Sequence, residues 1–76
     1  MKIRVSDIRQ MYKKAKASFN ASSPRRLGSA EKYLYEFGIA NNMTVIVKEW
    51  QGPYPVVESL EFNTEADYAW FVLRYS

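Results

Sequence analysis

Seven lysine and arginine side chains occur in the stretch RVSDIRQMYKKAKASFNASSPRR, residues 4–26, and only one acidic residue accompanies them. Ammonium and guanidinium groups without local carboxylate partners are suited to bind phosphate oxygens, and each phosphate contact makes the affinity depend on salt. Arginine can also hold a phosphate through two parallel hydrogen bonds or stack on a base, which lysine cannot do. These residues could therefore form an anion-binding surface if the fold gathers them on one side.

The rest of the chain carries the opposite charge. Residues 1–26 contain eight Lys and Arg and one acid, a net charge of +7. Residues 27–76 contain three Lys and Arg and seven acids, a net charge of −4, so that the whole chain has +3. Such a separation creates an electrostatic dipole whose basic end can attract an anionic partner.

The residue types that most catalytic and metal sites require are missing. The chain has no cysteine and no histidine, which excludes Ser-His-Asp and Cys-His catalysis and removes the usual zinc ligands. Glu58 and Glu61 would point to opposite faces of a strand, whereas Glu65 and Asp67 suit the first turn of a helix. No glycine-rich phosphate loop is present. We expect a protein that is not an enzyme and that uses no metal and no cofactor.

Length and composition favour one small globular domain over residues 1–76, with 47% hydrophobic and 16% aromatic residues. No apolar run is long enough to cross a membrane, and the amino terminus lacks the apolar segment of a secretory signal. The lack of cysteine is consistent with a reducing compartment. We therefore expect a cytoplasmic protein that does not contact membranes.

A helix is expected over residues 6–19. Ser6 is suited to cap its start, and Asp7 would lie favourably at the positive end of the helix dipole. Apolar residues recur at helical spacing and form one stripe for the core. The members of this stripe are Ile8, Met11, Tyr12, Ala15 and Phe19.

Three basic residues of this helix fall on one side, next to the apolar stripe. At about 100° per residue, Arg9, Lys13 and Lys16 lie within about 60° of one another, whereas Lys14 lies on a different side. Residues 20–29 are expected to form a loop that carries two further arginines close to this ridge. The candidate nucleic-acid-binding residues are therefore Arg9, Lys13, Lys16, Arg25 and Arg26.

Residues 31–50 have two possible interpretations. As a β-hairpin, an alternating strand leads through the turn at Asn41 and Asn42 into a β-branched strand that ends at Trp50. As a helix followed by that strand, Ser29 would cap the helix and Gly38 would stop it. We favour the hairpin because four apolar residues alternate along its first strand. These residues are Tyr33, Tyr35, Phe37 and Ile39.

A further strand is expected over residues 55–62, and a last helix follows, with Thr64 and Asp67 in a pattern similar to a capping box. The fold class that these elements indicate is α+β. The favoured order is helix, three-stranded antiparallel meander, helix (αβββα). The alternative order is ααββα, in which residues 31–39 are helical.

The last helix has two apolar stripes on roughly opposite sides, so it must be covered on both. One stripe consists of Ala66, Ala69, Trp70 and Leu73. The other consists of Tyr68, Phe71, Val72 and Tyr75, and we expect it to contact a partner or a second copy in a homodimer if it is not core. Polar substitution of Phe71 and Tyr75 would then disrupt association, whereas unfolding of the monomer would identify the stripe as core.

Taken together, these features indicate a non-enzymatic binding protein whose partner is the backbone of RNA or DNA, with RNA slightly favoured, or a protein that handles nucleic acid. The alternative is a protein–protein inhibitor or adaptor that binds an acidic protein surface or uses the aromatic stripe of the last helix. In size and composition the chain resembles the small accessory proteins with which bacteriophages block host enzymes. That likeness, which extends to no motif, would place the protein in the host cytoplasm.

Overall fold

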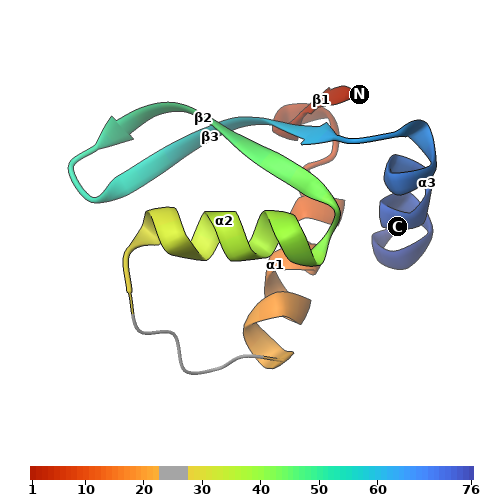
Figure 1. The fold of residues 1–76 in the computed structure, drawn as a ribbon, viewed down its shortest axis with the longest axis horizontal. Coiled ribbons are helices and arrows are strands. Elements are labelled where there is room, and N and C mark those ends of the chain that lie inside the picture. The colour runs from red at the N-terminus through yellow and green to blue at the C-terminus, as the bar shows by residue number, and fades with distance from the viewer. Residues whose placement is uncertain (23–27) are drawn as a thin grey trace.

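The computed structural model describes residues 1–22 and 28–76 (Figure 1). The described residues combine α-helices with an antiparallel sheet in an α+β arrangement, which confirms the predicted fold class. The elements in chain order are β1 (Lys2–Arg4), the short 3-10 helix η1 (Val5–Asp7), α1 (Arg9–Ser22), α2 (Ala30–Ala40), β2 (Met43–Gln51), β3 (Tyr54–Phe62) and α3 (Glu65–Tyr75).

Residues 30–40 form a helix, so the favoured hairpin over residues 31–50 is wrong in its first strand, and the alternative in which residues 31–39 are helical is correct for this segment. The Ser29 hydroxyl accepts a hydrogen bond of 3.2 Å from the backbone N–H of Lys32, which caps the start of α2. Leu34 and Phe37 are buried at helical spacing, whereas Tyr35 is 70% exposed. A strand would have placed Tyr35 and Phe37 on the same face.

The three strands form an antiparallel sheet in the order β1-β3-β2. The predicted strands from Met43 and up to Phe62 are confirmed, but the third strand is β1 and not residues 33–39. In the register, Leu60 of β3 lies opposite Ile3 on one side and Val45 on the other. This row of apolar residues crosses the whole sheet, and β2 is left as an edge strand.

The start of α1 differs from its prediction. Ser6 lies within η1, and α1 begins only at Arg9, so Ser6 does not cap the long helix. The backbone N–H of Ile8 donates to the carbonyl of Val5 at 3.1 Å. This tight turn allows the chain to leave β1 and pass at once under the sheet, where Ile8 is buried.

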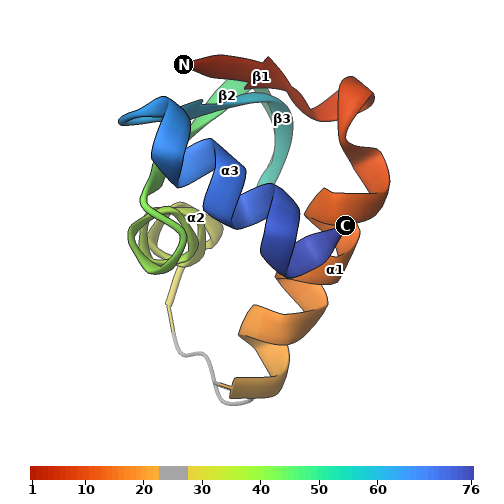
Figure 2. The same cartoon turned by 90° about the vertical axis from the view of Figure 1, so that its right-hand side faces the viewer.

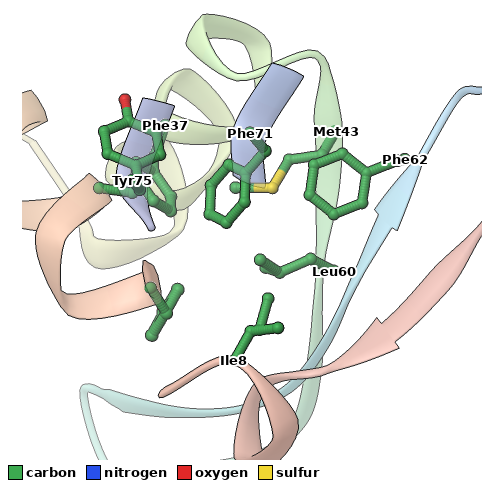
Figure 3. Packing of buried hydrophobic residues seen from close by; sticks show 9 residues of the cluster. Ile8, Phe37, Met43, Leu60, Phe62, Phe71 and Tyr75 are labelled. Atoms are coloured by element: carbon green, nitrogen blue, oxygen red, sulfur yellow. The ribbon is translucent and has the colours of Figure 1, made fainter. Parts of the chain in front are cut away.

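The α-helices all lie on the same side of the sheet, as the two perpendicular views show (Figures 1 and 2). Between them and the sheet is one cluster of buried side chains, which Figure 3 shows from close by. Aromatic rings from different elements meet there, with the Phe62 and Phe71 centroids 5.3 Å apart. The buried members of the cluster are Ile8, Tyr12, Ala15, Phe37, Met43, Leu60, Phe62, Phe71 and Tyr75.

Asn41 connects the carboxyl ends of α2 and α3 inside this core. Its Nδ2 donates to the carbonyl of Phe37 at 3.0 Å, and the Tyr75 hydroxyl donates to its Oδ1 at 3.1 Å. The next residue, Asn42, has a φ of 57°, a conformation that asparagine tolerates better than most residues. The predicted turn at these two residues is therefore present, but it joins a helix to a strand.

Candidate nucleic-acid interface

The rotation of α1 about its axis is set by aromatic packing on its buried side. The Tyr12 ring meets the ring of Phe37 edge to face, with centroids 5.9 Å apart, and the Phe19 ring lies 5.5 Å from the same partner. Such pairs contribute stability beyond their buried area and have preferred geometries. With these rings held against α2, the basic residues at other angles of α1 must face outward or along the flank.

The α1 ridge is the set Arg9, Lys13 and Lys16, which follow one another at helical spacing on one flank of α1. Arg9 and Lys13 are exposed, whereas Lys16 is half-buried. Within residues 1–22 and 28–76, no ion pair engages any of the three. Their charges are therefore available to an external anion. The other two predicted binding residues, Arg25 and Arg26, lie outside the described residues.

Lys16 is drawn inward by Tyr12. Its Nζ lies 5.0 Å from the centroid of the Tyr12 ring, a distance typical of a cation–π contact. The aliphatic stem of the lysine covers apolar surface while its charged end stays at the edge. Sequence reasoning placed Lys16 on the same flank as Arg9 and Lys13, but it could not show that the side chain points toward a ring.

Lys16 and Tyr12 belong to an open groove of about 400 Å³ where α1, α2 and β3 meet. Tyr33 comes from the first turn of α2, and Tyr54 from the start of β3, where its side chain is 72% exposed. We call this the tyrosine groove, defined by Tyr12, Lys16, Tyr33 and Tyr54. It combines the exposed ring of Tyr54 with the ammonium group of Lys16, which suits a ligand that has both an aromatic ring and negative charge.

Two of the tyrosines are fixed by their surroundings. Burial, together with the nearby Tyr33, raises the pKa of Tyr12 to about 12, so its hydroxyl is neutral at physiological pH. The Tyr33 hydroxyl donates a hydrogen bond of 2.7 Å to Oδ1 of Asn20, which connects the end of α1 to the first turn of α2. The floor of the tyrosine groove is therefore well ordered, whereas Tyr54 stands at its exposed rim.

Sequence reasoning missed Tyr54 because its role depends on tertiary structure. The residue follows the turn at Gly52 and Pro53, and its position in the sequence gives no sign that it approaches α1. The favoured hairpin would have placed Tyr33 and Tyr35 on one face of a sheet, but both lie on α2, and of the two Tyr33 reaches the tyrosine groove.

The predicted interface stripe on α3 is part of the core. Phe71 is 3% and Tyr75 is 7% exposed, and Tyr68 and Val72 are half-buried. The ring of Phe71 packs between those of Phe62 and Tyr75, at centroid distances of 5.3 and 5.0 Å. This stripe is therefore not a surface for a partner. The opposite stripe is exposed instead, with Trp70 at 70% and Leu73 at 76%.

The described residues hold no group of three acidic side chains that could bind a metal ion. None of the described helices has the length and apolar character needed to cross a membrane. Comparisons of the chain with protein-family models, with curated protein sequences and with solved structures gave no match.

Proposed function

We propose that this protein binds single-stranded nucleic acid, RNA in preference to DNA, without catalysing a reaction. The observation that carries the proposal is the position of Lys16, whose ammonium group lies over Tyr12 in the tyrosine groove while Arg9 and Lys13 project from the same helix. Phosphate-binding cations and aromatic faces are thus adjacent. Proteins that bind single strands without sequence preference combine these two elements.

The length of the α1 ridge fits a short stretch of backbone. Lys16 lies seven positions after Arg9, so the ridge is about 10 Å long at 1.5 Å per residue. A strand stacked as in B-form DNA advances by about 3.4 Å per nucleotide along its axis and would place at most about three phosphates beside the ridge, and a more extended single strand would place fewer. The phosphates would contact the α1 ridge, and a base next to them would reach Tyr54, whose ring is exposed and free to stack.

The test compares two lysines of the same helix. Lys13 belongs to the α1 ridge and Lys14 does not, yet both are exposed and each lies in the middle of α1. Fluorescence anisotropy with labelled single-stranded RNA and DNA should show that Lys13→Glu weakens binding by about tenfold, as expected for losing one phosphate contact and adding a repulsive charge. Lys14→Glu should have a smaller effect.

Equal losses in the two variants would contradict a defined ridge, because they would show that only the net charge matters. Wild-type protein that fails to bind at low salt would contradict the proposal as a whole. Tyr54→Ala tests the groove separately. It should weaken binding to single strands, where stacking on one ring contributes about 1–3 kcal/mol, and leave binding to duplex unchanged. Circular dichroism would verify that each variant is folded.

A further inference from the structure

One face of α3 is apolar and uncovered. Figure 2 shows α3 on the outside of the molecule, with the sheet, α1 and α2 around its inner side. The α3 outer face consists of Ala66, Ala69, Trp70 and Leu73, all exposed. A tryptophan and a leucine that are 70% and 76% exposed on one helix are costly to keep in water, and grouped apolar residues of this kind mark contact sites.

The order of small and large residues on this face complements itself when α3 is laid antiparallel on a copy of itself. With the two helices centred between Ala69 and Trp70, the two tryptophans, which lie toward the same flank as Asp67 and Arg74, meet each other beside the two-fold axis. In the same register each Leu73 lies opposite Ala66 of the second copy. The leucines then enter the space beside the alanines, and every contact occurs twice about the two-fold axis, as a contact between identical surfaces requires.

The charges beside this face complement themselves in the same arrangement. Asp67, Trp70 and Arg74 border one hollow of about 200 Å³ next to the turn between α2 and β2, so the acid and the arginine share a flank of α3. A two-fold axis between antiparallel helices brings the same flank of both copies together. Arg74 would then lie beside Asp67 of the second copy, and the pair would occur twice. In a parallel arrangement opposite flanks of the two helices would meet, so Arg74 would lie away from Asp67 of the second copy.

We infer that a second copy of this chain covers the α3 outer face through an antiparallel α3–α3 contact. The apolar pattern and the charge pattern both repeat under the same two-fold axis, which contact with an unrelated partner would not require. One face of an 11-residue helix is smaller than a standard interface, so the dimer should be weak and reversible. The core stripe with Phe71 and Tyr75 stays buried within each copy, and the α1 ridge lies outside the dimer contact.

Sedimentation equilibrium from about 10 μM to about 1 mM tests the inference. The wild-type protein should dimerise within this range. Arg74→Asp and Asp67→Arg should each weaken the dimer by at least about tenfold, because each places like charges on the shared flank. An equimolar mixture of the two variants should recover dimers, since one chain then carries two acids on the shared flank and the other chain carries two arginines there.

Two further variants test whether dimerisation depends on the α3 outer face and not on apolar surface elsewhere. They also show whether an effect of Asp67→Arg could come from loss of the helix cap. Leu73→Asp leaves the cap at Thr64 intact and should abolish dimers. Ile39→Asp, on an exposed apolar position of α2, should leave them unchanged. A wild-type protein that stays monomeric at about 1 mM would overturn the inference. The inference would also be overturned if a mixture of Arg74→Asp and Asp67→Arg formed no dimers. The same holds if Ile39→Asp dissociated the dimer and Leu73→Asp did not.

Discussion

Tyr12 takes part both in the core and in the candidate interface. One edge of its ring packs against Phe37, and its face lies under the ammonium group of Lys16. The side chain is only 8% exposed, so the proposed site is built directly on the core. A ligand that contacts Lys16 would therefore meet a group whose position is fixed by packing and not by a mobile loop.

The raised pKa of Tyr12 predicts a loss of stability at high pH. Because the folded protein holds this proton up to about pH 12 and the unfolded chain loses it near pH 10, the folded state binds more protons in between. The free energy of unfolding should be independent of this group below pH 10. It should then fall by at most about 1.4 kcal/mol per pH unit as the pH rises toward 12.

Urea denaturation of wild type and Tyr12→Phe at a series of pH values measures this effect. The variant cannot ionise at residue 12, so the wild type should lose stability relative to it above pH 10. Tyr54→Phe, which removes the hydroxyl of an exposed tyrosine, is the matched control for the loss of one phenol from the chain. A difference between wild type and Tyr12→Phe that does not change with pH would contradict the assigned pKa.

For the candidate site, the sequence was informative about single residues and uninformative about their partners. Helical periodicity placed Arg9 and Lys13 on one flank of α1, and the structure leaves both exposed there. Periodicity could not show that Lys16 lies over an aromatic ring or that Tyr54 approaches it, because those contacts depend on how the hairpin packs on α1. The sequence left open whether the α3 stripe with Phe71 and Tyr75 is core or interface, because both faces of α3 are similarly apolar, and the structure buries it.

At the scale of elements, the corner between α2 and β2 depends on a glycine. The chain turns back so closely there that a Cβ on Gly38 would lie 2.5 Å from the carbonyl oxygen of Met43. Gly38 was considered as a helix stop in the sequence, yet α2 continues to Ala40. Its role is to allow β2 to pass directly against the helix.

We expect Gly38→Ala to destabilise the protein by about 1–3 kcal/mol, the usual cost of forcing extra volume into a packed site. In an exposed helix the same substitution would stabilise by about 1 kcal/mol. The sign of the effect therefore tests the close contact. Urea denaturation measures the change in the free energy of unfolding. Ala17→Gly at an exposed position of α1 is the control, and it should cost about 1 kcal/mol through helix propensity alone. A more stable Gly38→Ala variant would contradict the geometry.

The segment at residues 31–39 shows why element type was ambiguous. Over so few residues an alternating pattern and a helical pattern can share members, here Tyr33 and Phe37. The deciding feature is which other residues are buried, and Leu34 is buried while Tyr35 is exposed. That choice depends on the sheet above α2, which local sequence does not describe. The β-branched run of β2 had no such competitor and was predicted correctly.

At the scale of the whole molecule, the α+β class followed from the number and type of elements, but the composition of the sheet did not. Residues 2–4 are too few to show alternation, so no pattern in the sequence indicated β1. Charge separation was visible in the sequence, and α1 carries much of the positive part on one element.

This separation predicts how binding to nucleic acid should depend on salt. Contact by the three cations of the α1 ridge would give a slope of about −2 for log affinity against log salt concentration on single strands. Lys13→Glu should reduce the magnitude of the slope by about 0.7, and Lys14→Glu should leave it nearly unchanged. Anisotropy titrations at four or more salt concentrations measure the slopes. A wild-type slope near zero would show that phosphates are not the ligand.

The position of β1 in the sheet has a consequence for how the chain reaches its native state. β1 pairs with β3, and Ile3 lies opposite Leu60, which is far away in the sequence. In contrast, β2 and β3 are neighbours in the sequence and are joined by a short turn. Local pairing forms faster than pairing between distant segments. The hairpin should therefore assemble first during folding, and a growing chain on the ribosome should keep its basic amino-terminal segment undocked until residues 59–61 have been synthesised.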